Sequence, residues 1–146
     1  MPRVKLDLPA KMVFTTEIPV RITDINYRGH LSNDSLLSIL HEARVQFLNK
    51  FGFTESDIGG VGIIMSDAVL VYKAEVFYGD VLTIEIGVDD IQAVGADITY
   101  RVLVSGKEAA RAKTGIVFFD YGNRKIVQAP QAFKDLFGQS IGPVKK

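Results

Sequence analysis

Cysteine is absent from the 146 residues, which excludes disulfide bonds, thiolate metal sites and a cysteine nucleophile. An excess of one charge is also absent, because Lys and Arg together number 17, as do Asp and Glu. This balance argues against binding to nucleic acid or to an anionic membrane. Residues 1–11 lack the apolar core of a signal peptide, and no run approaches the roughly 20 apolar residues that span a bilayer. We therefore expect a cytoplasmic protein with no nucleic-acid or membrane partner.

Metal-binding and phosphate-binding motifs are missing as well. The two histidines, His30 and His41, lie eleven positions apart without a carboxylate cluster to complete a ligand set, so we expect no metal site. Neither a P-loop, a dinucleotide-binding glycine motif nor a G-x-S-x-G nucleophile elbow occurs. The length and the 47% hydrophobic content instead predict a single domain, residues 1–146, with a substantial core.

The first periodic segment alternates between apolar and polar residues. Phe14–Ile22 places Phe14, Ile18 and Ile22 on one side, which is typical of a half-buried strand. Pro19 interrupts this segment and has no N–H to donate. The strand is therefore expected at the edge of a sheet.

A helical period follows, starting at Asn33 or Asp34. Apolar residues recur at steps of three and four, and Ser32, Asn33 and Asp34 are all suitable N-caps. Gly52 is placed to end the helix in a left-handed conformation. The stripe consists of Leu36, Leu40, Ala43, Phe47 and Phe51, widened by Leu37 and Leu48.

Most of the remaining chain predicts strands. Four apolar or alternating runs cover residues 63–77, 82–88, 98–104 and 109–119, separated by short turns such as 78–80 and 105–106. Short connections favour an antiparallel meander of these four strands, and Pro130–Phe137 predicts a short final helix. The expected fold is α+β, one curved antiparallel sheet of five to six strands around one long helix. A second surface, most simply a two-fold partner, should cover the remaining apolar side chains.

Polar residues concentrate where the first strand gives way to the long helix. The segment 24–34, DINYRGHLSND, gathers Asp24, Asn26, Gly29 and His30 just before a helix N-terminus. Free N–H groups at such an end bind developing negative charge. This junction is the best candidate for a site.

The junction motif D-I-N-Y-R-G-H-L-S-N at 24–33 resembles the pattern D-x-D/N-x-x-G-H-V-N-N of acyl-CoA thioesterases of the 4-hydroxybenzoyl-CoA thioesterase group, which have the hotdog fold. Two further pieces agree: H-E-A-R at 41–44 within the helix, and Y-K-A-E-V-F-Y-G-D at 72–80, which resembles Y-x-x-P-x-x-x-G-D. The resemblance runs from about Phe14 to Pro130. It implies hydrolysis of a thioester of coenzyme A or of a carrier protein, with no cofactor beyond the coenzyme A of the substrate, in a homodimer or a tetramer whose sites are shared between subunits.

The same resemblance assigns roles to individual residues. Asn26 stands where many relatives have a catalytic aspartate, and His30 stands at the histidine of the long-chain branches. An asparagine cannot act as a base, so the simplest carboxylate mechanism does not transfer. A thiolate leaves readily, since the pKa of a thiol is roughly 8.5, and hydrolysis then needs an oriented water, a base and a bound oxyanion. The residues expected to bind the oxyanion or the substrate are Gly29, Ser32, Asn33 and Tyr72.

We hypothesise that Asn26 orients the water or the carbonyl group, while the proton goes to His30, Asp24 or Glu42. Two other functions stay open. The missing aspartate favours a hotdog module that binds an acyl thioester without hydrolysing it. His30 with Glu42 would alternatively suit a hotdog hydratase or dehydratase. The cations Arg101, Arg111 and Lys113 are better explained by solubility than by binding the phosphates of coenzyme A.

Overall fold

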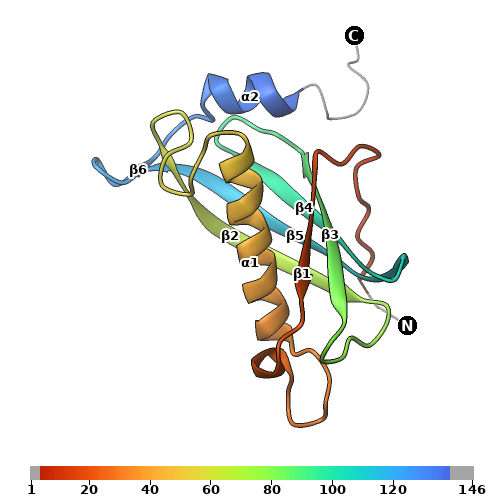
Figure 1. The fold of residues 1–146 in the computed structure, drawn as a ribbon. Coiled ribbons are helices and arrows are strands. Elements are labelled where there is room, and N and C mark those ends of the chain that lie inside the picture. Colours follow the sequence, from red (N-terminus) through yellow and green to blue (C-terminus); the bar gives the residue numbers. More distant parts are fainter. Residues whose placement is uncertain (1–3, 139–146) are drawn as a thin grey trace.

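The computed structural model describes residues 4–138, and in it one long helix lies across the concave face of a curved antiparallel sheet (Figure 1). This is the α+β architecture that the sequence predicts. The strands are β1 (Phe14–Pro19), β2 (Gly62–Tyr72), β3 (Val81–Asp89), β4 (Gly95–Val104), β5 (Lys107–Asp120) and β6 (Lys125–Ile126), and the helices are η1 (Ile22–Asp24, 3-10), α1 (Asn33–Lys50) and α2 (Gln131–Phe137).

Helix α1 follows the predicted pattern closely. Ser32 is its N-cap, and the Ser32 hydroxyl oxygen accepts a hydrogen bond from the Ser35 amide at 3.4 Å. The buried face contains the predicted residues from Leu36 to Leu48, but Leu37 is 38% exposed and does not belong to the core. Arg44, which is 7% exposed, is buried instead, because it lies four residues after Leu40 on the same face.

Strand β1 is the edge strand that Pro19 predicts: within residues 4–138 it pairs with β3 alone. Its predicted C-terminal end at Ile22 is wrong. The strand stops at Pro19, and residues 22–24 turn into η1 because the Asp24 carboxylate accepts a hydrogen bond from the Arg21 amide at 2.8 Å.

The prediction of a four-strand meander is wrong for the position of β2. β3, β4 and β5 are consecutive neighbours, but β2 pairs with β5 at the opposite edge, giving the order β1-β3-β4-β5-β2. β2 and β3 are therefore joined by a crossing segment, residues 73–80, rather than by a hairpin. Eight residues extend to at most about 26 Å, whereas three strand spacings are about 14 Å, so the crossing fits.

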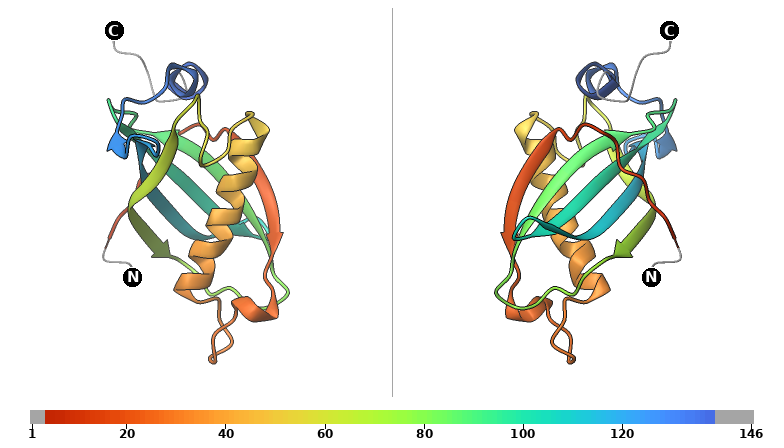
Figure 2. Two further views of the ribbon diagram at one scale, coloured as in Figure 1. Left: turned by 90° about the vertical axis from the view of Figure 1, so that its left-hand side faces the viewer. Right: turned by 90° about the vertical axis from the view of Figure 1, so that its right-hand side faces the viewer.

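Chain segments outside the sheet supply part of the second surface that the sequence requires. The N-terminal segment runs over the face of the sheet opposite α1 (Figure 2, right). A Cβ at Gly87 would meet Met12 Sδ at 2.9 Å, so this glycine lets the segment lie close to β3. At the other end, the α2 residue Phe133 packs on Phe118 with ring centroids 5.1 Å apart.

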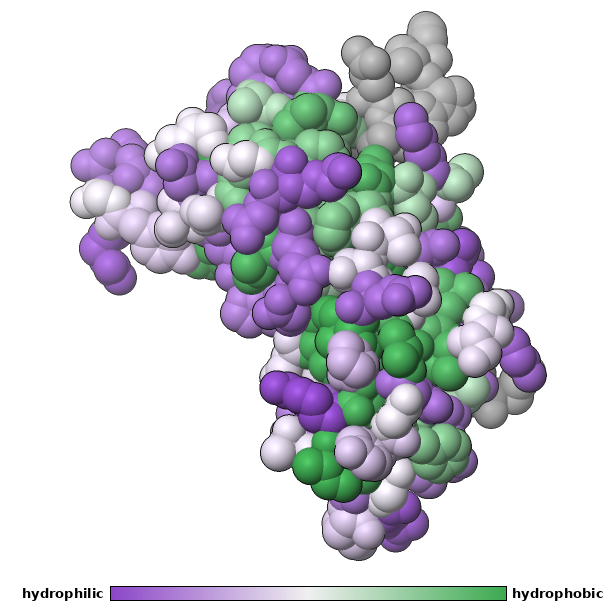
Figure 3. Space-filling model, in the orientation of Figure 1, coloured by the Kyte–Doolittle hydropathy of each residue, from purple (hydrophilic) through white to green (hydrophobic). Residues whose placement is uncertain are grey.

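Strand β2 remains poorly covered. Five consecutive residues, 64–68, are exposed, so both faces of the strand are open there. Apolar side chains are visible among polar ones on the side of the molecule shown in Figure 3. Two exposed apolar residues, Leu37 of α1 and Met65 of β2, line the same cavity between these elements.

Candidate active site

A cavity of about 390 Å³, here called the site cavity, lies between the N-terminal end of α1 and the start of the crossing segment. Four of the eight predicted site residues line it together: Asn26, His30, Asn33 and Tyr72. Leu31 and residues 73–76 complete the lining. The strand-to-helix junction is thus brought against the end of β2.

Asn26 organises the loop that forms one wall of the site cavity. Its side-chain Oδ1 accepts hydrogen bonds from the amides of Arg28 at 2.9 Å and His30 at 3.2 Å. Both partners are N–H donors, so the carboxamide orientation is fixed with oxygen toward the backbone. Gly29 permits the tight turn, since its φ is +86°. Among residues 4–138 Nδ2 of Asn26 has no acceptor, which leaves its two hydrogens available at the cavity.

His30 faces a carboxylate that sequence analysis missed. Its Nε2 lies 3.5 Å from Oε2 of Glu75 in the crossing segment. The ring also meets Phe77 edge-to-face, with centroids 5.4 Å apart. These two contacts orient the imidazole, and when Nε2 faces Glu75 its Nδ1 is left for other chemistry.

The start of α1 offers one unused amide to the site cavity. The Ser32 amide donates to the Asp24 carbonyl oxygen at 3.4 Å, and the Leu36 amide donates to the Ser32 carbonyl oxygen at 2.9 Å. The Asn33 amide has no acceptor among the described residues, and Asn33 lines the cavity. An unpaired N–H at the positive end of a helix is suited to a developing oxyanion.

Tyr72 presents a polar atom without a partner. Its hydroxyl is buried and has no hydrogen-bond partner within residues 4–138. Burial, together with the negative charge of Asp34, raises the pKa of Tyr72 to about 12. The phenol is therefore protonated near neutral pH and can donate a hydrogen bond to a ligand in the site cavity.

Two of the predicted carboxylates lie outside the site cavity. Asp24 is 3% exposed and forms an ion pair with Arg21, Oδ1 to Nη2, at 3.1 Å. Burial acts to raise the pKa of Asp24, but the hydrogen bonds and charge of Arg21 outweigh it and hold that pKa below its usual range. Glu42 is exposed and accepts a hydrogen bond from Gln46 Nε2 at 2.8 Å. The pairing of His30 with Glu42 is therefore not formed.

The other residues considered in the sequence have structural partners within the chain. Ser32 caps α1 and donates its hydroxyl hydrogen to Asp34 Oδ1 at 2.7 Å. The three sheet cations all pair with carboxylates of the chain: Arg101 with Glu85, Arg111 with Glu108, and Lys113 with Asp67.

Glu75 was missed because the sequence gives no sign that the crossing segment passes the junction loop. The hydrogen bond from the Leu31 amide to the Val76 carbonyl oxygen, at 2.8 Å, joins the two. To find Glu75 from the sequence, residues 73–80 would have had to be recognised as a crossing segment and not only as the end of a strand and a turn.

No helix within residues 4–138 combines the length and apolar character needed to cross a membrane. In the same part of the chain, no group of three or more His, Cys, Asp or Glu side chains is arranged to hold a metal ion.

Comparison with known proteins identifies a family. The family model described as "Thioesterase-like superfamily" matches residues 20–137. A protein of Aquifex aeolicus (strain VF5) named "Putative esterase" is 25% identical over 122 residues, covering 82% of this chain and 94% of its own. The solved structure of a 1,4-dihydroxy-2-naphthoyl-CoA thioesterase from Synechocystis superposes with a TM-score of 0.74 at 23% identity, covering 83% of this chain and 92% of its own. A gentisyl-coenzyme A thioesterase superposes with a TM-score of 0.76 at 17% identity, covering 85% and 99%. These superpositions establish the hotdog fold.

Proposed function

Because the chain belongs to the thioesterase-like superfamily and is a thioester hydrolase, we propose that it hydrolyses the thioester of an acyl-coenzyme A to the free acid and the thiol. The names of the two solved relatives, both thioesterases of aromatic acyl-CoA compounds, support coenzyme A as the thiol. The proposal includes no cofactor and a cytoplasmic location.

One observation carries the proposal. Beside a histidine that is paired with a carboxylate, the site cavity has two N–H donors without an acceptor among residues 4–138, one from the backbone and one from a side chain. The Asn33 amide and the Asn26 Nδ2 group would bind the thioester carbonyl oxygen and its oxyanion. His30, oriented by Glu75, would take a proton from the attacking water. Water oxygen then bonds to the carbonyl carbon, the C–S bond breaks, and the thiolate leaves with the proton held by His30.

His30 is preferred over the other two candidate bases for structural reasons. The Asp24 carboxylate is already engaged by Arg21, and the Glu42 carboxylate accepts from Gln46. Neither residue lines the site cavity, whereas His30 does. A general base must lie within hydrogen-bond reach of the proton that it removes.

We further propose that the protein is a homodimer, or a tetramer of such dimers, whose subunits meet along β2. This strand is a sheet edge with both faces exposed at residues 64–68, and an exposed edge of this length favours pairing with another strand. Exposed Leu37 and Met65 would be covered in the same step. A partner here would also cover the cavity between α1 and β2 that Leu37 and Met65 line.

A panel of activity assays tests the proposed reaction. Free thiol release is measured from short-chain, long-chain and aromatic acyl-CoA thioesters and from acyl carrier protein, beside hydration of an enoyl-CoA. We expect thiol release from at least one acyl-CoA and no hydration. Retained acyl-CoA binding with no turnover would favour the non-catalytic binding module, for which the engaged Oδ1 of Asn26 is the supporting observation. Hydration alone would favour the hydratase.

A further inference from the structure

A second cavity, of about 500 Å³, follows the site cavity along the same two walls. On α1 the lining passes from Asn33 to Leu37 and His41, at helical steps on one face. On β2 it passes from Tyr72 to Ala68, a rise of about 13 Å at 3.3 Å per residue. The two cavities thus lie one after the other between α1 and β2, an interval here called the groove, with the proposed thioester site at one end.

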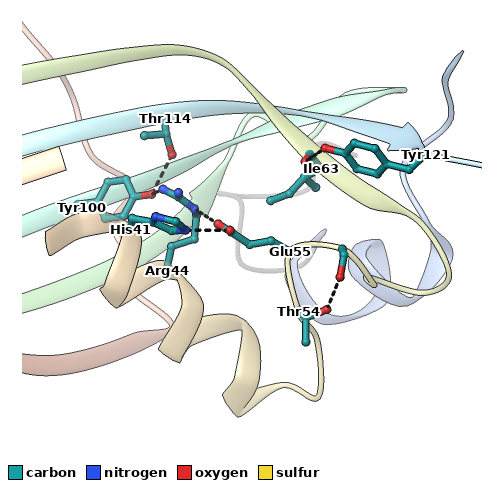
Figure 4. A network of polar contacts seen from close by, with 9 residues as sticks. His41, Arg44, Thr54, Glu55, Ile63, Tyr100, Thr114 and Tyr121 are labelled. Carbon is teal, nitrogen blue, oxygen red and sulfur yellow. Dashed lines mark hydrogen bonds and ion pairs between the residues drawn. The ribbon is translucent and has the colours of Figure 1, made fainter. Parts of the chain in front are cut away.

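A buried arginine forms part of the inner wall of the second cavity. Arg44 is 7% exposed, and its Nε donates to Glu55 Oε2 at 2.6 Å, while Nη1 donates to the Tyr100 hydroxyl oxygen at 3.0 Å (Figure 4). Among residues 4–138 no acceptor meets Nη2. A guanidinium only donates hydrogen bonds, so this nitrogen is free to donate to water or to a ligand in the second cavity.

The contacts around Arg44 hold its guanidinium rigidly. The Tyr100 hydroxyl accepts from Arg44 and therefore donates to Thr114 Oγ1, at 2.8 Å. Burial raises the pKa of Tyr100, which keeps that hydroxyl protonated. Glu55 also bonds His41 Nε2 at 2.9 Å, so its carboxylate is fixed from two sides. The unused donor is preorganised, and such a donor binds an acceptor with little further ordering.

Charge around the second cavity selects a neutral acceptor. Glu55 already balances Arg44, and Asp67 on the β2 wall is paired with Lys113 at 3.0 Å. A carboxylate ligand would add a negative charge beside two others. A hydroxyl or keto oxygen adds none, and a hydroxyl can also donate to Ser38, whose side chain lines this cavity.

We propose that the second cavity recognises a neutral oxygen, hydroxyl or keto, at the far end of the acyl group, with Arg44 as the specificity-determining residue. The inference rests on the proposed thioesterase function, because it places the acyl group along the groove from the site cavity. The proposed substrates are therefore acyl thioesters that carry a hydroxyl or keto oxygen at the far end of the acyl group.

Matched pairs of substrates test the inference in the full-length protein. We would measure kcat/KM for hexanoyl-, octanoyl- and decanoyl-CoA and for the ω-hydroxy form of each. At the length that fills the groove, the hydroxylated substrate should be preferred about tenfold or more, the expected effect of a hydrogen bond to a charged group. Equal values at every length would overturn the inference, and this comparison needs no variant.

A double variant, Arg44→Met with Glu55→Gln, then tests whether Arg44 causes the preference for the hydroxylated substrate. Removing both charges together avoids leaving one buried and unpaired. The ratio of the two kcat/KM values, measured on one preparation, does not depend on the folded fraction, and it should fall to about one. Tyr121→Phe is the control and should keep the wild-type ratio. A preference that survives in the double variant would overturn the role of Arg44.

Direct binding separates failure of this inference from failure of the proposed function. If the wild-type protein hydrolyses no acyl-CoA, the proposed function is wrong, and calorimetry with the free ω-hydroxy and plain acids still decides the inference. Tighter binding of the hydroxy acid, lost in the double variant, would support it. Equal binding, or none, would overturn it.

Discussion

Asn26 and His30 are joined by two hydrogen bonds, each of which involves a backbone group of His30. The Asn26 amide donates to the His30 carbonyl oxygen at 2.8 Å, and Asn26 Oδ1 accepts from the His30 amide at 3.2 Å. Asn26 therefore shapes the loop with its side-chain oxygen, while its side-chain nitrogen has no acceptor among residues 4–138. In the proposed mechanism, loop order and substrate binding depend on different atoms of this one side chain.

Asn26→Ala should affect stability and activity together. It removes two acceptor bonds at a partly exposed loop, so we expect a loss of about 1 kcal/mol, or about 3 °C in Tm. Loss of the Nδ2 donor should lower kcat by at least about tenfold. Asn26→Asp is the control for the loop, since a carboxylate accepts the same two amides, and its Tm should stay near the wild-type value. An Asn26→Asp protein as unstable as Asn26→Ala would contradict this account.

Glu75→Gln should reduce kcat about tenfold with little change in KM, because Glu75 orients His30 in the proposed mechanism and has no assigned contact with the acyl group. His30→Ala should reduce kcat by about 10²-fold or more. The measurement is steady-state thiol release from the best acyl-CoA of the panel. Glu17→Gln, at an exposed position of β1, is the matched control and should leave kcat unchanged. Equal effects of Glu17→Gln and Glu75→Gln would sink the assignment.

The buried Asp24 carboxylate should make stability depend on pH. Its pKa in the folded protein is below the ordinary value, so its contribution is fully present above about pH 3.9 and is lost as the pH falls through the folded-state pKa. Asp24→Asn should lower the urea midpoint by about 0.5 M near neutral pH. The difference from wild type should shrink in acid. Asp7→Asn, at an exposed position, should show no such difference at either pH.

Tyr100→Phe should destabilise the protein more than Tyr121→Phe. Loss of the Tyr100 hydroxyl leaves Arg44 Nη1 and Thr114 Oγ1 unpaired in the interior, at a cost of about 1–3 kcal/mol. Tyr121 is 51% exposed and donates only to the Ile63 carbonyl oxygen, at 3.0 Å, where water replaces the lost partner. Thermal unfolding of the two variants measures the difference. Equal losses would show that the Arg44 network is not tightly coupled to the fold.

Met65→Glu should weaken self-association if subunits meet along β2. A charge on the exposed strand would have to be desolvated in the interface. Sedimentation velocity should show a shift from dimer toward monomer over micromolar concentrations. Val81→Glu is the control, because Val81 lies on β3 and is similarly exposed, at 47% against 41% for Met65. A dimer that tolerates Met65→Glu but not Val81→Glu would place the interface elsewhere.

Local patterns in the sequence predicted the elements well. The helix from Asn33, its Ser32 cap and the edge position of β1 all follow from interactions within a few residues, such as a capping hydroxyl or a missing N–H at Pro19. The junction loop was located for the same reason. Three of its predicted site residues, Asn26, His30 and Asn33, share a cavity because helix start and loop are continuous in the chain.

Relations between distant segments were not predictable in this way. The turn at residues 78–80 is real, but it ends a crossing segment, and no local pattern distinguishes that from a hairpin. The contact of His30 with Glu75 depends on this crossing. Arg44 did carry a signal, since a charge occupied an apolar position of the helical stripe, yet its partners Glu55 and Tyr100 come from other parts of the chain.

The strand order also determines when the chain can fold. Phe14 pairs with Ile86, and Gly62 pairs with Phe119, so neither edge of the sheet forms until residues far along the chain have been synthesised. The apolar stripe of α1 is synthesised long before most of the strands that bury it. Such distant pairings slow folding and prolong the exposure of apolar surface. We expect the rate of folding to be limited by closure of these two edges of the sheet.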